Sequence, residues 1–309
     1  GFTALNHYFE TQPLPHIGAW YAQQLPEWLL RTGTATTLFL ELLVPFFIFL
    51  PRPFRLFAAL ATIVLQLFII ATSNHNFVNL LTILLCLFLL DDRFLMRIRI
   101  LPSQRPSPHM EEAGKMHQPV TTTSKLSMIF VAVIAISAGI GSGVKMVLQQ
   151  PLPPPLGQTL SLVQQYGIGN AYHIFPTMQT ERHELEIQGS MDGKDWQSYR
   201  FKYKPGPIKR APAFIVPHQP RLDWMLWFVP TQRPEMFYWF ERFMMQLWRN
   251  EKVVTDLLEH NPFTREAPKY LRILVYHYRF TNAKEHSKSG NWWKRTYLGE
   301  FPKVVPRRP

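Results

Sequence analysis

The stretch Leu56-Phe-Ala-Ala-Leu-Ala-Thr-Ile-Val-Leu-Gln-Leu-Phe-Ile-Ile-Ala-Thr72 decides the fold of this 309-residue chain. It contains 17 residues and no charged side chain. A helix needs about 17 to 25 mostly apolar residues to cross the ~30 Å hydrocarbon core of a bilayer. The stretch therefore predicts a transmembrane helix.

Further apolar stretches lie on both sides of it. They run from Thr34 to Leu50, from Phe77 to Leu90 and from Leu126 to Val147. The stretch from Phe77 has only 14 residues before Asp91, which leaves two alternatives: it crosses the bilayer, or it re-enters on the side where it began. We expect an α-helical transmembrane bundle with about four spans in this chain.

Loop charges predict the orientation of the spans, because short cytoplasmic loops carry an excess of Lys and Arg. The loops at 51–55 and 91–105 are basic, whereas residues 73–76 contain neither Lys nor Arg. We therefore expect the transmembrane helices within residues 33–147, with a cytoplasmic loop at 91–125. Residues 1–32 then form an extracytoplasmic or lumenal pre-span segment, and residues 148–309 form an extracytoplasmic or lumenal soluble domain.

Alternation of apolar and polar residues predicts strands in the soluble domain. His183–Gly189 and Gln197–Lys204 alternate cleanly, and the residues at 190–193 between them favour a turn. This hairpin is similar to a strand–turn–strand unit of galactose-binding-like β-sandwiches. Upstream of it, Pro151–Pro155 predicts a stiff spacer after the last span.

Two further elements complete the expected domain. Pro234 is a favourable first residue for a helix, and apolar and aromatic residues then recur every three or four positions up to Trp248. The run Tyr270–Phe280 is apolar or aromatic nearly throughout, which predicts a central strand. The extramembrane domain is therefore expected to be α+β or β-sandwich-like.

The charge balance is basic. The chain has 33 Lys and Arg against 21 Asp and Glu, a net charge of +12. Such a surface attracts anionic lipid headgroups or an acidic partner, but the basic residues alternate with acids and aromatics, so no nucleic-acid partner is predicted. The only cysteine, Cys86, excludes an intramolecular disulfide and Cys-pair zinc motifs. We predict no metal site and no cofactor.

Several ionisable residues are candidates for chemistry. Glu41 lies within a span, where a carboxyl group is costly and is either functional or part of helix packing. His7, Glu10 and His75 lie on the predicted outer side. Nucleophile elbows, zinc-protease motifs and phosphate-binding glycine loops are absent from the sequence.

A second group of candidates lies at His218-Gln219-Pro-Arg221-Leu-Asp223-Trp224. Asp223 either orients His218 or forms a structural ion pair with Arg221, and the structural alternative is favoured. Trp224 and Trp227 are residue types that dominate binding energy at protein interfaces. We expect this segment to lie beside residues 7–16.

These motifs resemble those of the lipase maturation factor family. The resemblance rests on sequence runs along almost the whole chain: His7-Tyr-Phe-Glu-Thr-Gln12-Pro13-Leu-Pro15, Phe77-Val-Asn-Leu-Leu, Leu90-Asp91-Asp92, Phe201-Lys-Tyr-Lys-Pro205-Gly206, Pro217–Trp224 and Asn261-Pro-Phe263. The family resemblance implies a multi-pass membrane protein that helps secreted lipases, or other exported client proteins, to reach the active state. It makes Gln12, Pro13 and Pro15 candidate client-binding residues, together with His218, Gln219, Arg221, Asp223, Trp224 and Trp227.

The resemblance also implies a location. An animal protein of this family would lie in the endoplasmic reticulum membrane, whereas a bacterial homologue, which the poverty in cysteine suggests, would lie in the inner (plasma) membrane. The family's first spans are not found after Gly1, so we expect an N-terminally truncated member. A rival interpretation is an integral-membrane enzyme distantly similar to vitamin K-dependent carboxylases, using Glu41, His75 or the His7 and Glu10 pair. The motifs favour the non-enzymatic interpretation.

Overall fold

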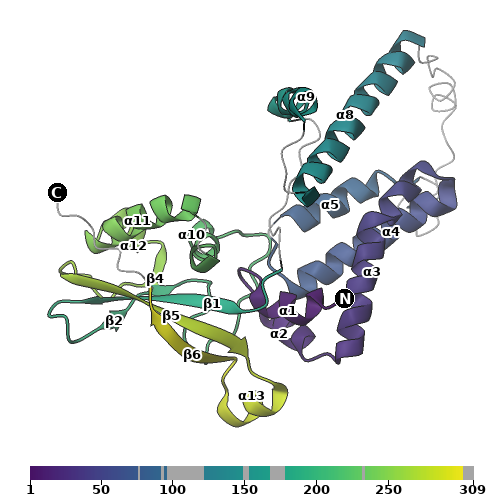
Figure 1. The fold of residues 1–309 in the computed structure, drawn as a ribbon. Coiled ribbons are helices and arrows are strands. Elements are labelled where there is room, and N and C mark those ends of the chain that lie inside the picture. The colour runs from purple at the N-terminus through teal and green to yellow at the C-terminus, as the bar shows by residue number, and fades with distance from the viewer. Residues whose placement is uncertain are drawn as a thin grey trace, which may run out of the picture. The chain divides into compact units, whose positions relative to one another are not determined.

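The computed structural model describes residues 1–75, 77–91, 94–95, 122–148, 153–167, 178–231 and 234–301. Figure 1 shows helices in the first half and a mixed α/β arrangement in the second. The elements are α1 (Ala4–Thr11), α2 (Ile17–Gln23), α3 (Glu27–Leu42), η1 (Val44–Phe49), α4 (Arg52–Thr72), α5 (Val78–Leu87), α8 (Thr122–Leu148), α9 (Pro154–Gln165), β1 (Arg182–Ser190), β2 (Gln197–Ser198), β3 (Arg200–Phe201), α10 (Arg221–Leu226), η2 (Val229–Thr231), α11 (Pro234–Trp248), α12 (Lys252–Thr255), β4 (Leu258–His260), β5 (Tyr270–Phe280), α13 (Ala283–Ser289) and β6 (Trp293–Glu300).

The chain divides into two compact units. One consists of residues 1–97 and 178–309, and the other of residues 98–177. The smaller unit contains α8, a 27-residue helix that includes the predicted fourth span, and α9. The expected proline spacer is only partly correct, because Pro154 and Pro155 form the first turn of α9, where a missing N–H costs nothing. Most of the predicted loop at 91–125 lies outside the described residues.

Two helical stretches are long and apolar enough to cross a membrane, Glu27–Phe49 and Arg52–Thr72. The first begins seven residues before the predicted Thr34, because the short preceding helix α2 ends before Pro26 and α3 starts directly after it. Its last part tightens into the 3₁₀ helix η1, which begins where Pro45 can no longer donate to the α-helical ladder. Val78–Leu87 and Ala132–Gly141 are shorter apolar helices.

Helices α4 and α5 form an antiparallel hairpin, and polar side chains link the two helices near both ends. Just after the connection between the helices, the buried Asn79 side chain donates a 2.6 Å hydrogen bond to the side-chain Oε1 of Gln66. At the opposite end, Arg52 at the start of α4 forms an ion pair with Asp91, which follows α5. The chain after Asn79 therefore returns along α4 to the level at which α4 began.

The soluble domain is built on a four-stranded antiparallel sheet of order β2-β1-β5-β6. The predicted hairpin is confirmed, because Gln188 pairs with Ser198, and β5 is central as predicted. The second strand of the hairpin leaves this sheet after Ser198, and β3 pairs instead with β4. α11 begins at Pro234 as predicted.

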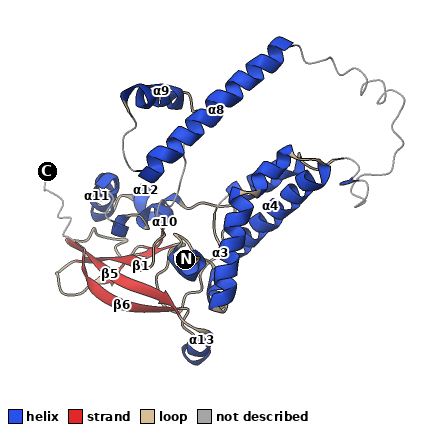
Figure 2. Ribbon diagram, turned by 45° about the vertical axis from the view of Figure 1, so that its right-hand side comes forward, coloured by secondary structure: helices blue, strands red, loops and turns tan. Residues whose placement is uncertain are grey.

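One face of the sheet carries the main hydrophobic core. Leu185, Ile187 and Ile273 face the apolar side of α11, including Phe240 and Leu247. Figure 2 shows α10, α11 and α12 together on one side of the strands. The β-sandwich-like alternative is therefore wrong for the described residues, since a helix layer covers the apolar face and the only other sheet has two strands.

The predicted pre-span segment 1–32 is helical and belongs to the same unit as the sheet. Phe9 and Trp20, from α1 and α2, form a second buried cluster with Tyr278, Phe280 and Trp293. Tyr278 and Phe280 come from β5 and Trp293 comes from β6, at the end of the sheet next to α13. The N-terminal helices therefore join the soluble domain to the helical hairpin.

Candidate functional site

The first family-like motif, residues 7–16, is a buried junction. Pro13 and Pro15 keep this segment extended and lack N–H groups of their own. The side chain of Gln12 donates to the carbonyl oxygens of Phe9 and Thr72, at 3.2 and 3.0 Å. Asn74 donates to the Leu14 carbonyl oxygen at 2.9 Å. The motif is thereby attached to the 73–76 end of the α4–α5 hairpin.

His16 completes this attachment. Its Nδ1 accepts the Gly18 N–H at 2.9 Å and caps α2, so Nε2 carries the proton and donates to the Ile70 carbonyl oxygen at 3.1 Å. Burial lowers the pKa of His16, partly offset by its hydrogen bonds to the backbone. The close approach of α2 to α4 needs Gly18, because a Cβ there would lie 1.9 Å from the Ala71 carbonyl oxygen.

Arg182 attaches the same segment to the sheet. Its side chain is fully buried, and its guanidinium donates to the carbonyl oxygens of Glu10, Gln12 and Pro13. Glu184 balances its charge at 2.6 Å and also pairs with Lys204 at 2.9 Å. A guanidinium offers five donors in a fixed fork, which suits this convergence of carbonyl oxygens. Sequence reasoning missed Arg182, although an arginine at the start of a half-buried strand could have indicated a buried ion pair.

The second motif contributes to the same junction. The indole N–H of Trp227 donates to the Thr11 carbonyl oxygen, and Asn74 bonds the backbone of Ala213 and Ile215. Residues on both sides of the Pro217–Trp224 segment thus bond to the first motif or to Asn74, and the proximity of the segment itself stays a prediction.

Asp223, however, does neither of the things predicted for it. It accepts the backbone N–H groups of Tyr203 and Lys204, both at 2.8 Å, rather than pairing with His218 or Arg221. Burial raises its pKa, although those two hydrogen bonds and the Lys204 charge act in the opposite direction.

Burial divides the candidate client-binding residues into two groups. The buried group has partners inside the fold and presents no surface to another protein: Gln12, Pro13, Pro15, Asp223 and Trp224. Trp227 is half-buried, and the exposed group is His218, Gln219 and Arg221. This division could not be predicted from the sequence, because exposed Arg221 lies only two and three residues before buried Asp223 and Trp224 on α10.

The candidate enzymatic residues separate as well. Glu10 accepts the Phe280 N–H at 2.7 Å, and burial raises its pKa, while that hydrogen bond and nearby cations lower it. No hydrogen bond or ion pair joins it to His7 within the described residues. The Glu10 carboxylate is turned toward the sheet, so the structure does not bring it together with His7.

His75 lies in a different cluster. Its Nε2 is hydrogen-bonded to the Tyr8 hydroxyl, which also accepts a 3.0 Å hydrogen bond from Ser73. Burial raises the pKa of Tyr8 to about 12, with the Ser73 bond lowering it and the Glu41 charge raising it. Burial lowers the pKa of His75 to about 4. An effective general base titrates near the working pH, so neither group is tuned for acid–base catalysis at neutral pH.

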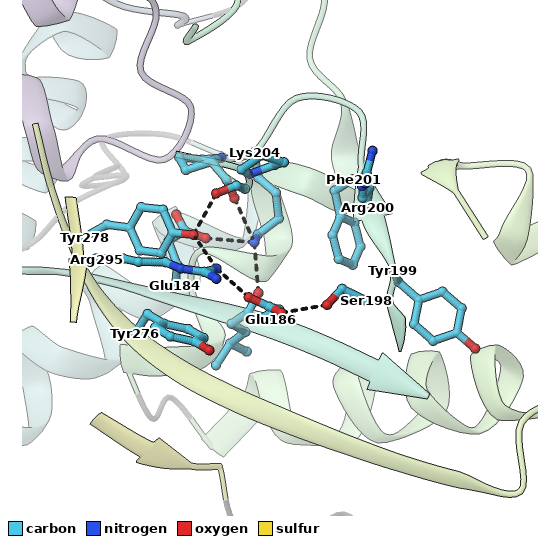
Figure 3. A pocket seen from close by; sticks show the side chains of 14 residues that line it. Glu184, Glu186, Ser198, Tyr199, Arg200, Phe201, Lys204, Tyr276, Tyr278 and Arg295 are labelled. Atoms are coloured by element: carbon cyan, nitrogen blue, oxygen red, sulfur yellow. Dashed lines mark hydrogen bonds and ion pairs between the residues drawn. The ribbon is translucent and has the colours of Figure 1, made fainter. Parts of the chain in front are cut away.

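A cavity of about 240 Å³ lies on the polar face of the sheet, which the sequence analysis did not single out (Figure 3). Its charges neutralise one another: Glu184 pairs with Lys204, and Glu186 pairs with Arg295 at 2.6 Å. Ser198 donates a further 2.6 Å bond to Glu186. The alternation of Glu184 and Glu186 along β1 was the signal that could have located it. Among the described residues, no cluster of three His, Cys, Asp or Glu side chains could hold a metal ion.

Comparison with known proteins identifies two matching families, one for each half of the chain. The lipase maturation factor transmembrane domain matches residues 1–97, and the lipase maturation factor C-terminal domain matches residues 168–303. Three similar proteins are lipase maturation factor 2 of Xenopus tropicalis and lipase maturation factor 1 of Homo sapiens and of Bos taurus. They are 28%, 30% and 31% identical to this chain over 97% of its length.

The alignments cover nearly all of this chain but only about half of each relative. The aligned region takes in 56%, 54% and 55% of those three proteins, so the chain spans about half the length of the curated relatives it matches. No solved structure matches the chain. Nothing in these comparisons points to a carboxylase.

Proposed function

Because the chain belongs to the lipase maturation factor family, we propose that it is a membrane-embedded maturation factor that helps secreted lipases, or other exported proteins, to reach the active state. The observation that carries the proposal is the match of both family domains in one chain, at residues 1–97 and 168–303. The carboxylase alternative has no comparable support and is set aside.

The junction gives this role a physical basis. Arg182, Trp227 and Asn74 attach the soluble domain to the outer end of the hairpin through several buried hydrogen bonds. A domain fixed in this way stays at the bilayer surface, where newly exported chains emerge. We propose that clients contact its exposed residues, including His218, Gln219 and Arg221, and that the buried motif residues maintain this surface.

The proposed topology has four spans. In it, residues 91–125 are cytoplasmic, while residues 1–32 and 148–309 are extracytoplasmic or lumenal. The Arg52–Asp91 ion pair supports a third segment that crosses, because it brings the chain after α5 back to the start of α4. In a eukaryotic cell the membrane would be that of the endoplasmic reticulum, as the animal relatives suggest, and in a bacterium it would be the inner membrane.

A rescue experiment tests the role. The chain is expressed in cells that lack their own lipase maturation factor and secrete a reporter lipase, and lipase activity is measured per unit of secreted lipase protein. We expect the specific activity to rise, while a co-expressed alkaline phosphatase is unchanged. An unchanged lipase at normal expression of the chain would count against the proposal.

A further inference from the structure

Among the residues that the structure describes, β6 leaves one edge of the sheet open beyond Trp293. It comprises eight residues, Trp293–Glu300, and forms the border of the sheet beyond β5 (Figure 2). Residues 294–298 and 300 are exposed. The opposite edge, β2, has only two residues. An exposed edge presents unpaired N–H and C=O groups that can pair with another extended chain.

The register shows which backbone groups point outward. Thr281 donates its N–H to the Trp292 carbonyl oxygen at 3.1 Å, so this pair is hydrogen-bonded. Bonded and non-bonded pairs alternate along an antiparallel ladder. With Trp293 opposite Phe280 and Tyr297 opposite Tyr276, the backbone groups of Trp293, Arg295 and Tyr297 therefore face away from β5.

The first of these positions already has a partner. The N–H groups of Trp292 and Trp293 both donate to the Ile208 carbonyl oxygen, at 2.9 and 3.1 Å, so the chain at Ile208 covers this end of the edge. Beyond Trp293, the outward groups of Arg295 and Tyr297 have no hydrogen-bond partner in the part of the chain that the structure describes.

The usual protection of an edge is weakened here. Charged side chains discourage edge pairing, but Lys294 is paired with Glu285 and Arg295 with Glu186. The uncharged Tyr297 and Leu298 are 54% and 53% exposed. A bulge follows these positions on β6 itself: Tyr276 pairs with Tyr297 and Val275 with Gly299, so Leu298 is the extra residue and the regular edge ends at Tyr297.

Resting on the maturation role above, we propose that the β6 edge, meaning the outward groups of Arg295 and Tyr297 with the side chains of residues 296–298, binds an extended, uncharged segment of an incompletely folded client as an added strand. The outward N–H and C=O groups of Arg295 and Tyr297 are two residues apart, which is the spacing at which an added antiparallel strand forms its hydrogen bonds. Such main-chain pairing supplies affinity without requiring a particular client sequence. Such a site suits clients that expose strands before they fold and bury them afterwards.

Fluorescence anisotropy tests the proposal directly. The probe is a labelled peptide of alternating Thr and Val, added to the detergent-solubilised full chain, and its control is the same peptide N-methylated at alternate residues. Tyr297→Pro removes one outward N–H without removing a bond to β5, whereas Tyr297→Ala keeps the N–H and removes the ring. We expect Tyr297→Pro and N-methylation each to weaken binding about tenfold, and Tyr297→Ala to change it less than about twofold.

The outcomes are separable. Equal binding of the N-methylated peptide, equal loss in both Tyr297 variants, or capture of a second copy of this chain would overturn the proposal. If Tyr297→Pro does not fold, the peptide comparison on the unmodified chain still decides. In the rescue assay, an inactive unmodified chain contradicts the maturation role, whereas a fully active Tyr297→Pro in a working assay contradicts only the edge proposal.

Discussion

The indole N–H of Trp227 donates a 2.8 Å hydrogen bond to the carbonyl oxygen of Thr11, 216 residues earlier in the chain. A side chain that the sequence indicated as a client anchor thus holds the protein's own N-terminal segment. Its neighbours Trp224 and Phe228 are buried. Trp227 therefore helps to position the soluble domain, and we propose that any effect of its substitution on clients follows from that position.

Trp227→Phe should isolate this hydrogen bond. A smaller aromatic ring remains while the donor is lost, and we expect a loss of at least about 0.5–1.5 kcal/mol in the free energy of unfolding. Thermal or chemical unfolding of the detergent-solubilised protein measures it. Trp28→Phe, at a position that is 67% exposed, is the matched control and should have no effect. Equal stability of the two variants would show that the bond does not contribute.

Substitution of single acids or bases separates a maturation factor from an enzyme. Removing a general acid or base typically costs ~10²–10⁴-fold in rate. We expect His7→Ala, His75→Ala and Glu41→Gln each to leave most of the lipase yield, and Trp227→Ala to reduce it more than any of them. Lipase activity per secreted lipase, at matched expression of the variants, is the measurement. Abolition by one acid or base variant with normal folding would restore the enzymatic interpretation.

Arg182→Met should be severely destabilising. It removes the guanidinium that donates to three backbone carbonyl oxygens, and it removes one of the two cations paired with Glu184. Breaking a buried ion pair costs about 3–5 kcal/mol. Arg31→Gln is the control, because its pair with Glu27 is exposed and such pairs contribute about 0–1 kcal/mol. Unfolding curves of the two variants should therefore differ clearly. Similar curves would mean that the junction adds little to stability.

The cluster around His75 should make the protein sensitive to acid. Burial lowers the pKa of His75 from 6.5 to about 4. A folded-state pKa below the unfolded value means that the unfolded chain binds the proton more strongly, so stability is complete above pH 6.5 and falls as the pH drops toward 4. His75→Gln should flatten this dependence in melting curves recorded between pH 7 and 4. An unchanged slope would contradict the assignment to His75.

Reporter fusions should decide whether the third segment crosses. Alkaline phosphatase is active only outside the cytoplasm, whereas a fluorescent protein fused within residues 103–118 should fluoresce inside it. We expect phosphatase activity from a fusion after Pro309 and none from a fusion at 103–118. Phosphatase activity only at 103–118 would favour a re-entrant segment, and would require another reason for the Arg52–Asp91 pair.

The sequence was most informative where the local pattern of apolar residues was strong. The run at 56–72 is a helix, Tyr270–Phe280 is the central strand, and α11 begins at Pro234, since each pattern reflects a single local preference. It was least informative for β6, whose Lys294, Arg295 and Thr296 have no clear alternation, and for α1 and α2, which have only 8 and 7 residues. Those elements form because Trp20, Phe280 and Trp293 pack together across the chain.

The candidate site was harder to predict than the fold. The two family-like motifs could be recognised, but the pattern could not show which of their side chains point inward. Asp223 is the clearest example, because its partners are backbone N–H groups 19 and 20 residues away that no side-chain motif reveals. Arg182, which holds the junction, belongs to a strand whose alternation indicated only a buried face.

The bond between Glu10 and Phe280 sets an order of events during synthesis. These residues are 270 positions apart, and at ~5–20 residues per second the second is made roughly 14 to 54 seconds after the first. Throughout that interval the Glu10 carboxylate lacks this partner, although the segment after it can bond to the helical hairpin through Gln12 and Asn74 once residues 72–74 are made. The amino-terminal helices are thus made first and receive their last contacts from β5, and a chain that stops before β5 leaves Glu10 without its partner.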